Sequence, residues 1–461
     1  MIDTHTVSLP RRPVDAEKLG YFRFGALADG VILTTEHGRW HHLPPHTFRD
    51  LLAGRVEPGH AEYDALAAKG FLRDQLALDD MAAAIRNRRR YVGVGPVAHQ
   101  IQLADDQGAR LSVETAKDII DHAMLSTAHA LDLDLLTPAG WWDGDLLVFL
   151  LQYATEKNRY EGKTITWRLH TDLASLPEKA DAWLVDKRVI VRARIDGPAD
   201  LHDAQRPWSG AADHATVAAN LARVQALCAA RNRDAQRAEA DVVVGAGNAA
   251  HAGRVARALA EAGIRRVRLH PRLDGAGAID LDAWSTFVED FLTACAEQTR
   301  AGEPLVDEHT ATLVTRALRH EPGAVVAWRS PGEAGLGQLV YDVHGHIFPS
   351  AAAMALHAAG DAMFLLGKAG VLSYKDCVAH PTLRTLAVAS TLESLPGFAD
   401  HWAAPFCGVD PTAAYAATGD LFARTSSPAE VAAQLAAVTA VFRRLVQATD
   451  ADLATLQRWA E

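Results

Sequence analysis

Hydrophobic and polar positions divide the middle of the chain into alternating strands and helices. Alternation predicts a strand at 97–103 (VAHQIQL), and apolar runs predict strands at 131–136 and 164–169, with a helix at 146–157 between them. The segment from Val189 to Pro207 begins as a β-branched apolar run, which predicts a buried strand, and then breaks into a loop at a Gly-Pro pair. In this region polar residues gather where strands end.

A smaller pattern precedes these elements. Short strands are predicted for FRFGAL and VILTT, which Asp29 and Gly30 connect by a turn, and for RWHHL. Helices are predicted at 45–52 and 63–68, each followed by a glycine. The N-terminal region is therefore a small unit of strands followed by helices.

Composition and charge exclude some classes of function. The chain has 461 residues, of which 49% are hydrophobic and 22% charged, as in ordinary globular proteins with about three domains. Its net charge of -11 argues against a nucleic-acid partner. No apolar segment is long enough to span a bilayer and the first residues lack a signal-peptide core, so we expect no membrane partner and a cytoplasmic location.

The four cysteines are far apart in the sequence. None forms a close pair, so neither a disulfide framework nor a zinc knuckle is indicated. An iron-sulfur cluster needs three or four thiolates brought together, and the sequence contains no such group. The cysteines are Cys228, Cys295, Cys377 and Cys407.

The sequence motif in the loop after the strand at Val189 points to a known family. Asp196-Gly197-Pro198 is followed by Leu201-His202-Asp203 and by Arg206-Pro207. This motif resembles the corresponding loop of radical SAM enzymes of the SPASM type that modify peptides or proteins, most of all that of the His-Xaa-Ser-system radical SAM maturase. The resemblance runs from about Tyr21 to Gly419.

The resemblance implies a fold and a domain plan. The fold class is α/β, with a partial (β/α)6 TIM-like barrel of the radical SAM type at 91–300. A winged-helix-like peptide-recognition domain is implied at 1–90, and a degenerate SPASM-like cap with C-terminal helices at 301–461. In such a barrel, ligands sit at the carboxyl ends of the strands.

The sequence departs from the family wherever the family binds its cofactors. After the first barrel strand the family has CxxxCxxC, whereas this chain has 104–110, ADDQGAR. Its Gly-Gly-Glu-Pro motif is replaced by 137–142, TPAGWW, and the cap has Ser350, Phe398 and His401 where cysteines are expected. We therefore expect no iron-sulfur cluster and no S-adenosylmethionine.

Two sets of residues are candidates for binding. The resemblance implies a leader peptide added as a strand to the edge of the N-terminal sheet, for which the candidate edge is Val31, Ile32, Leu33, Thr34 and Thr35. Polar groups at the barrel strand ends are candidates for a pocket or peptide site, with mutual hydrogen bonding as the alternative. They are His170, Asp172, Arg194, Asp196, His202, Arg206 and His270.

No catalytic residue and no metal ligand is assigned. His344 and His346 lie two apart on a hairpin and with His401 could hold a metal, but exposed turn histidines are the simpler interpretation. A strand and glycine turn with Gly245, Gly247 and Ala250 resembles a dinucleotide-binding fingerprint, although His270 ends the next strand where an acidic residue is required.

These observations favour a cluster-free pseudoenzyme. It would bind a ribosomally made precursor or leader peptide, a partner maturation enzyme, or both, in peptide natural-product or protein modification. One alternative is a cluster-independent or metal-dependent enzyme that uses the polar barrel pocket. A second is a nucleotide-dependent oxidoreductase that uses the glycine turn.

Overall fold

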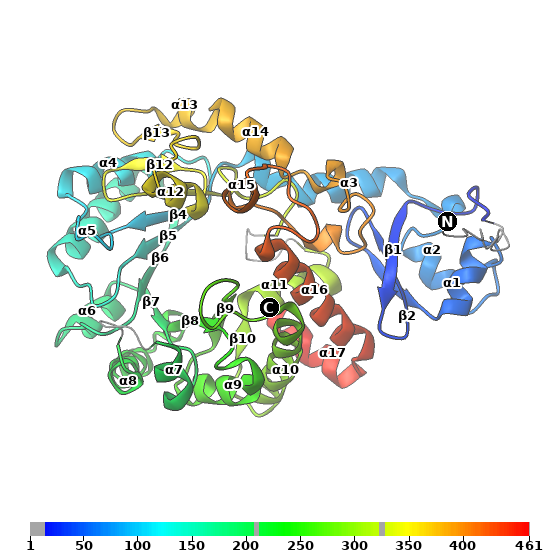
Figure 1. The fold of residues 1–461 in the computed structure, drawn as a ribbon, viewed down its shortest axis with the longest axis horizontal. Coiled ribbons are helices and arrows are strands. Elements are labelled where there is room, and N and C mark those ends of the chain that lie inside the picture. Colours follow the sequence, from blue (N-terminus) through cyan, green and yellow to red (C-terminus); the bar gives the residue numbers. More distant parts are fainter. Residues whose placement is uncertain (1–13, 207–211, 322–327, 461) are drawn as a thin grey trace, which may run out of the picture.

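A small N-terminal unit lies at one end of the molecule, beside a large curved sheet with its helices and a cap (Figure 1). The computed structural model describes residues 14–206, 212–321 and 328–460. Pro207, which ends the loop after the strand from Val189, lies outside the described residues.

The N-terminal unit is a three-stranded antiparallel sheet in the order β1-β2-β3. Its elements are β1 (Phe22–Leu27), β2 (Gly30–Thr35), β3 (Trp40–Leu43), α1 (Pro45–Leu52), α2 (Tyr63–Ala68) and α3 (Leu78–Arg88). The predicted helices are confirmed at their predicted bounds. Leu33 and Leu43 of the sheet pack against Phe48 and Leu51 of α1, which gives the unit its own core.

Six parallel strands in the described part of the chain, each followed by helix, form the partial (β/α)6 barrel predicted for its centre. The strands are β4 (Ala98–Gln102), β5 (Ala130–Leu136), β6 (Thr164–Thr171), β7 (Val189–Arg194), β8 (Glu239–Val244) and β9 (Arg266–Pro271). The helices are α4 (Val113–Met124), α5 (Gly144–Glu161), α6 (Ala180–Asp186), α7 (Ala199–Gln205), α8 (His214–Ala230), α9 (Ala252–Glu261) and α10 (Leu281–Arg300).

The remaining elements belong to the C-terminal third. The strands are β10 (Val306–Asp307), β11 (Gln338–Tyr341), β12 (His346–Phe348) and β13 (Gly367–Lys368). The helices are α11 (Glu308–Leu318), α12 (Ala351–Ala358), α13 (Tyr374–Val378), α14 (Pro381–Ala389), α15 (Pro411–Thr418), α16 (Ala429–Gln447) and α17 (Asp450–Gln457). Among the described residues, no helix is long and apolar enough to cross a membrane.

The large sheet continues beyond the barrel at both ends. The short strand β10 pairs with β9, and β11 pairs in parallel with β4. Within the described ranges, the ten-stranded sheet has the order β10-β9-β8-β7-β6-β5-β4-β11-β12-β13. Strands from both sides of the predicted domain boundary at residue 300 belong to this one sheet. The division of the chain into three domains stays a prediction.

Candidate functional site

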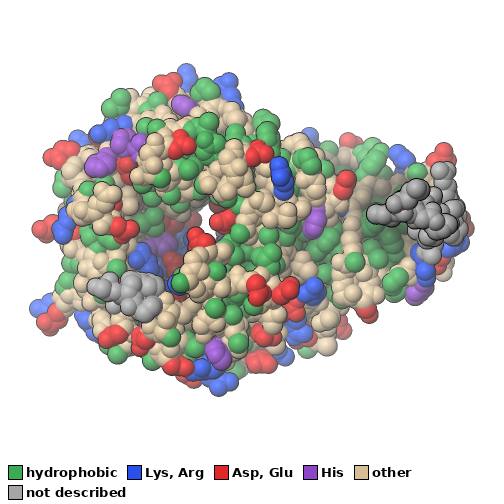
Figure 2. All heavy atoms as spheres, viewed as in Figure 1, with side chains coloured by type: hydrophobic (Ala, Val, Ile, Leu, Met, Phe, Trp, Pro, Cys, Tyr) green, Lys and Arg blue, Asp and Glu red, His purple; other side chains and the backbone are tan. Residues whose placement is uncertain are grey.

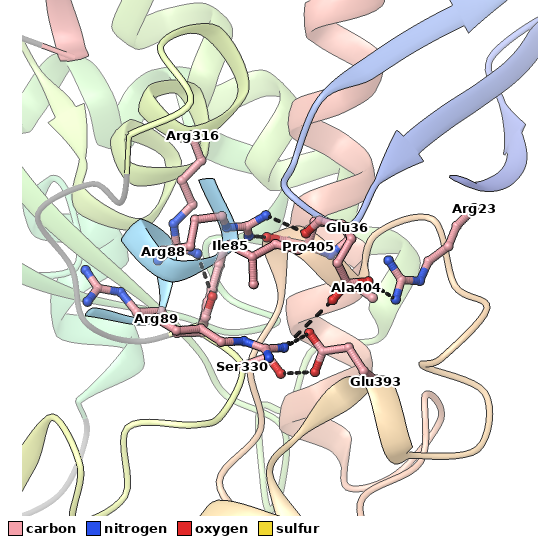
Figure 3. Close-up of a pocket in the computed structure, with 12 residues that line it drawn as sticks. Arg23, Glu36, Ile85, Arg88, Arg89, Arg316, Ser330, Glu393, Ala404 and Pro405 are labelled. Carbon is pink, nitrogen blue, oxygen red and sulfur yellow. Dashed lines mark hydrogen bonds and ion pairs between the residues drawn. The ribbon is translucent and has the colours of Figure 1, made fainter. Parts of the chain in front are cut away.

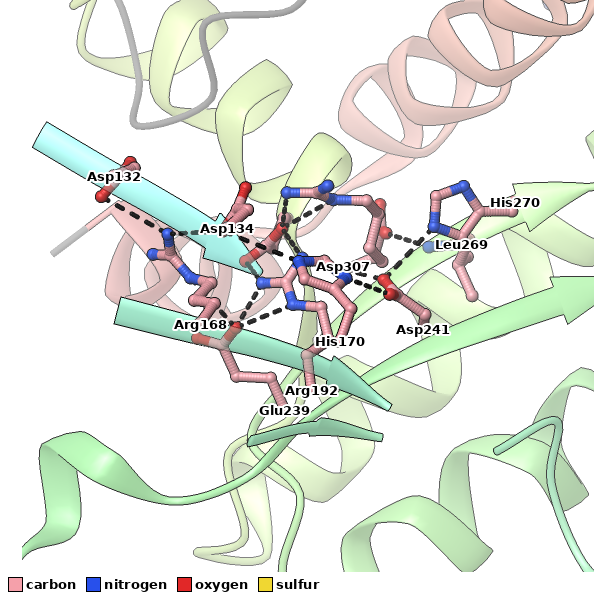
Figure 4. A network of polar contacts seen from close by, with 12 residues as sticks. Asp132, Asp134, Arg168, His170, Arg192, Glu239, Asp241, Leu269, His270 and Asp307 are labelled. Atoms are coloured by element: carbon pink, nitrogen blue, oxygen red, sulfur yellow. Dashed lines mark hydrogen bonds and ion pairs between the residues drawn. The ribbon is translucent and has the colours of Figure 1, made fainter. Parts of the chain in front are cut away.

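Charged side chains occupy alternate positions along the barrel strands and face its interior. On β7, Arg192 and Arg194 are two residues apart, and on β8 so are Glu239 and Asp241, which places each pair on one face. Figure 4 shows these side chains converging with residues of β5, β6 and β9. Figure 2 shows that the molecule is hollowed near β6 and β7, where arginine or lysine and histidine side chains are visible.

Arg192 is the centre of this network. Its side chain is fully buried and donates hydrogen bonds to two carboxylates: Nε lies 3.0 Å from Glu239 Oε2, and Nη2 lies 2.6 Å from Glu308 Oε1. Burial lowers the pKa of Arg192, but the two glutamates raise it more. Burial raises the pKa of Glu308, whereas Arg192 and Arg268 lower it to about 2, so the group is ionised.

A histidine pair holds Asp241 at the strand ends. His170 Nδ1 lies 2.9 Å from Asp241 Oδ2, and His270 Nε2 lies 3.3 Å from Asp241 Oδ1. Burial raises the pKa of Asp241, but the hydrogen bonds from both histidines hold it well below its usual range. Burial lowers the pKa of His170, yet its bonds to Asp134 and Asp241 raise it overall. This arrangement favours an imidazolium between two carboxylates.

A separate cavity of about 80 Å³ lies beside the loop after β7. Its polar lining comes from Asp172, Arg194, His202 and Arg206. Since one buried water needs roughly 10–15 Å³, the cavity has room for a few waters and not for a peptide. Arg194 donates to the Thr137 carbonyl at 2.6 Å, so even this lining is partly engaged within the chain.

The motif that carried the resemblance is a buried ion pair. Asp196 is fully buried, and Arg206 donates to both its carboxylate oxygens, at 2.7 and 3.0 Å. Asp196 Oδ1 also accepts the Val243 amide, and the Asp196 amide donates to His202 Nδ1. These contacts give the loop motif a structural role, which is to lock the loop after β7 onto β8.

The seven predicted strand-end residues thus fall into two groups rather than one shared cavity. His170 and His270 join the interior network through Asp241. Asp172, Arg194, His202 and Arg206 line the small cavity, where Asp196 is bound to Arg206.

The predicted peptide-binding edge is wrong. Residues Val31 to Thr35 belong to β2, which is hydrogen-bonded to β1 on one side and to β3 on the other. The prediction failed because the polar–apolar pattern gives the face of each side chain and not the order of strands in the sheet. The edges of this sheet are β1 and β3.

The glycine turn after β8 does not present its amides to a ligand. The Gly245 amide donates to Asn248 Oδ1, and the Ala246 amide donates to the Gly277 carbonyl. A dinucleotide fingerprint needs such amides free to meet a pyrophosphate. The structure therefore weighs against the oxidoreductase alternative.

An arginine-rich cavity lies where the N-terminal unit meets the cap (Figure 3). Arg23 pairs with Glu36 at 2.8 Å, and Arg89 pairs with Glu393 at 2.6 Å. Arg88 donates to the carbonyls of Glu36 and Pro405, and burial lowers its pKa to about 10. These bonds hold the β2–β3 turn against the cap and so fix the orientation of the N-terminal sheet relative to the cap.

A groove of about 200 Å³ lies between α3 and the rest of the N-terminal unit, with His320 also lining it. Arg39, just before β3, and Lys69, just after α2, contribute basic groups, while Asp80 of α3 contributes an acidic one. Lys69 Nζ also lies 2.9 Å from His41 Nδ1. The groove therefore opens next to the β3 edge, which the sequence interpretation had not singled out.

The sequence analysis missed several residues of the charged network around Arg192, although the alternation of charged and apolar residues along the strands could have revealed them. Asp132 and Asp134 alternate with leucines in ALDLDLL, and Arg168 precedes His170 by two positions, which is the pattern of a charged interior face. Glu308 gave no such signal because it lies in the first turn of α11 and follows no strand alternation. Only the fold brings it to Arg192.

The cysteines do not offer a cluster-binding set. All four are buried, burial raises the pKa of every thiol, and the described chain places no three of them together. Where the resemblance expects cap cysteines, Ser350 caps α12 and Phe398 is fully buried in the core. The donors present in the described chain do not fit a thiolate-bound cluster.

The fold is similar to that of solved structures that contain bound AdoMet. No protein-family model matches the sequence, and no curated protein matches it. Among solved structures, histidine-tagged anSMEcpe with bound AdoMet is similar, with a TM-score of 0.61 at 12% identity over 78% of this chain and 98% of its own. At this identity the likeness establishes the fold.

Two further solved structures contain peptides. Native anSMEcpe with bound AdoMet and Cp18Cys peptide has a TM-score of 0.60 at 11% identity, over 76% of this chain and 98% of its own. Streptococcus suis SuiB bound to precursor peptide SuiA has a TM-score of 0.49 at 11% identity, over 86% of this chain and 94% of its own.

The solved neighbours correct one expectation. We expected neither an iron-sulfur cluster nor S-adenosylmethionine, whereas structures that share this fold contain bound AdoMet. The expectation rested on two missing motifs, the CxxxCxxC cysteines and the Gly-Gly-Glu-Pro segment. A missing motif does not exclude S-adenosylmethionine, because other polar groups at the carboxyl ends of parallel strands can hold a ligand. The expectation of no cofactor is therefore withdrawn.

Proposed function

We propose that this chain binds a ribosomally made precursor or leader peptide along the outer edge of β3. It acts beside a partner maturation enzyme in peptide natural-product or protein modification. The observation that carries the proposal is a strand edge, Trp40–Leu43, that no other described strand pairs with and that lies next to a basic groove. A narrower relationship to the His-Xaa-Ser-system maturase is part of the same proposal.

The hydrogen-bond register of the sheet identifies the backbone groups that would meet the peptide. Thr35 donates its amide to the Arg39 carbonyl, so this is a hydrogen-bonded pair of the β2–β3 ladder. Such pairs alternate with non-bonded ones along antiparallel strands, so the amides of Trp40 and His42 point away from β2. Neither amide donates a hydrogen bond within the described chain. They are available to an added strand.

The groove beside this edge adds selectivity for side chains. Arg39 and Lys69 give it more positive than negative charge near β3, which favours a peptide with an acidic residue. Its volume of about 200 Å³ suits one or two side chains and not a folded partner. Main-chain pairing would then supply most of the affinity, and the groove would set the register.

The interior of the partial barrel supports a role as a pseudoenzyme, with the chemistry done by the partner. Arg192 is ion-paired with Glu239, Glu308 and Asp241, and the separate cavity of about 80 Å³ beside the loop after β7 is too small for a peptide. A catalytic use of this network is the alternative, because His170 between two carboxylates has the form of a general acid.

The test is a pair of substitutions at one residue. His42→Pro removes an outward amide while leaving the β2 ladder, and His42→Ala removes only the side chain, whose Nε2 lies 3.0 Å from the Leu27 carbonyl. We expect the proline to weaken binding of the precursor peptide encoded beside this chain by about tenfold, since one backbone hydrogen bond is worth roughly 1 kcal/mol and added-strand pairing is cooperative.

Fluorescence anisotropy with the labelled peptide measures the effect, and far-UV circular dichroism checks the fold. His42→Ala should bind within about threefold of the wild type. Equal binding by all three proteins, or no binding by the wild type, would remove the support for β3 as the peptide site.

A further inference from the structure

The hairpin of the cap brings together three side chains that the proposed function does not use. Asp342 lies just after β11, His346 begins β12, and His357 lies in the last turn of α12. One ligand atom from each residue lies within 4.8 Å of the ligand atoms of the other two. Figure 2 shows histidine side chains gathered at the surface in the part of the view where Figure 1 labels β12 and α4.

The hairpin turn fixes the carboxylate. Asp342 Oδ1 accepts the amides of His344 and His346, at 2.9 and 2.8 Å, and this holds the turn around Gly345, whose φ is +81°. The other oxygen, Oδ2, lies 2.7 Å from His346 Nδ1. One carboxylate oxygen therefore maintains the backbone, and the second remains directed at the imidazole.

His357 adds an independent observation. Its Nδ1 is buried and has no hydrogen-bond partner within the described residues, although its ring packs 5.2 Å from the ring of His346 and 5.3 Å from that of Phe348. Buried imidazole nitrogens are nearly always satisfied. A nitrogen left without a partner beside another histidine and a carboxylate is explained by a group that binds all three.

We propose that Asp342, His346 and His357 bind a divalent transition-metal ion, for which zinc is the best match. Two imidazoles and a carboxylate are ligands that zinc takes in proteins, with bonds of about 2.0–2.2 Å. Two ligands of a tetrahedral zinc ion lie roughly 3.3–3.6 Å apart at such bond lengths, so the three atoms, which are within 4.8 Å of one another, need to close by at most about 1.5 Å. Calcium and magnesium prefer an all-oxygen set, which this group does not offer.

The sequence analysis assigned no metal ligand and weighed only His344, His346 and His401 as a possible set. The set that the described structure brings together contains neither His344 nor His401. The true neighbour, His357, is brought in by α12. A metal here would tie the β11–β12 hairpin to that helix and leave a fourth position for water.

Zinc content is the direct test. Protein purified without a histidine tag, treated with a chelator and then incubated with zinc chloride should retain one zinc per chain after gel filtration, measured by plasma mass spectrometry. His357→Gln and His346→Ala should each lower zinc affinity in calorimetry by more than about tenfold. His129→Ala, at an exposed histidine just before β5, is the matched control and should bind as the wild type does.

Cobalt gives a second readout that does not depend on the stability of any variant. Cobalt bound at this site should show the visible absorption of a four-coordinate ion, and zinc should abolish it. Calorimetry in buffers of different ionisation enthalpy should show proton release, because the ion replaces the proton shared by Asp342 and His346. Substoichiometric zinc in the wild type, or equal zinc affinity in wild type and His357→Gln, would overturn the proposal.

Discussion

Replacing Arg192 by methionine is expected to destabilise the barrel strongly. The change keeps an unbranched apolar stem but removes a guanidinium that is bonded to Glu239 and Glu308 in a fully buried place. Breaking a buried ion pair by removing one partner costs about 3–5 kcal/mol, since the other charge stays buried.

Two neighbouring arginines decide where in that range the loss falls. Arg168 Nε lies 3.4 Å from Glu239 Oε2, and Arg268 Nη2 lies 3.0 Å from Glu308 Oε2, so neither glutamate is left without a cation. We therefore expect a loss near the lower end, about 3 kcal/mol at pH 7. Urea denaturation is the assay, because urea is uncharged and does not screen the network.

The loss should depend on pH in a defined direction. In the wild type the pKa of Glu308 is lowered from 4.5 to about 2, so its stabilisation, on the order of 3 kcal/mol, is present above pH 4.5 and is lost as the pH falls through 2. Without Arg192 the carboxyl protonates more readily. The difference between variant and wild type should therefore be smaller at pH 4 than at pH 7.

A surface ion pair provides the control. Arg254 pairs with Asp200 at 2.9 Å, with side chains 49% and 59% exposed, so Arg254→Met should leave the free energy of unfolding nearly unchanged. A loss for Arg192→Met at pH 7 no larger than that of this control, or a loss that does not change with pH, would refute the reasoning.

Two further predictions concern His170 and Gly332. The pKa of His170 is raised above 6.5, so its stabilisation is full below pH 6.5 and is lost as the pH rises through the raised value; His170→Gln should flatten thermal stability measured across this window. Gly332→Ala should cost about 1–3 kcal/mol in chemical denaturation, because its Cβ would overlap the Val409 carbonyl. Gly253→Ala, in α9 with open space around it, should instead be neutral or stabilising, and the reverse order would contradict the packing argument.

The sequence predicted where individual helices and strands lie, but it did not predict which of them contact one another. The predicted helix at 146–157 lies within α5, and the predicted strand at 131–136 lies within β5, since periodicity is a local property. The order β1-β2-β3 and the approach of Glu308 to Arg192 depend on contacts between distant segments. No periodicity records such contacts.

The candidate site illustrates the same limit. His202 and Arg206 were recognised from a motif, yet the structure shows that the motif mainly buries Asp196. His357 gave no signal, because it lies in an alanine-rich helix and its partners are on a hairpin. Site residues were therefore predicted only where a motif or an alternating pattern marked them. The residues that they contact could be identified only from the structure.

The parallel pairing of β11 with β4 determines how the chain can be divided. Gln338 to Tyr341 cover one side of Ala98 to Ile101, the first strand of the barrel. A fragment that stops at residue 300 would leave that side of β4 with unpaired backbone groups, which are a template for association with other chains. The barrel thus receives one of its protective strands from a segment far along the sequence, and a fragment without that segment should associate with other chains more readily than the full chain does.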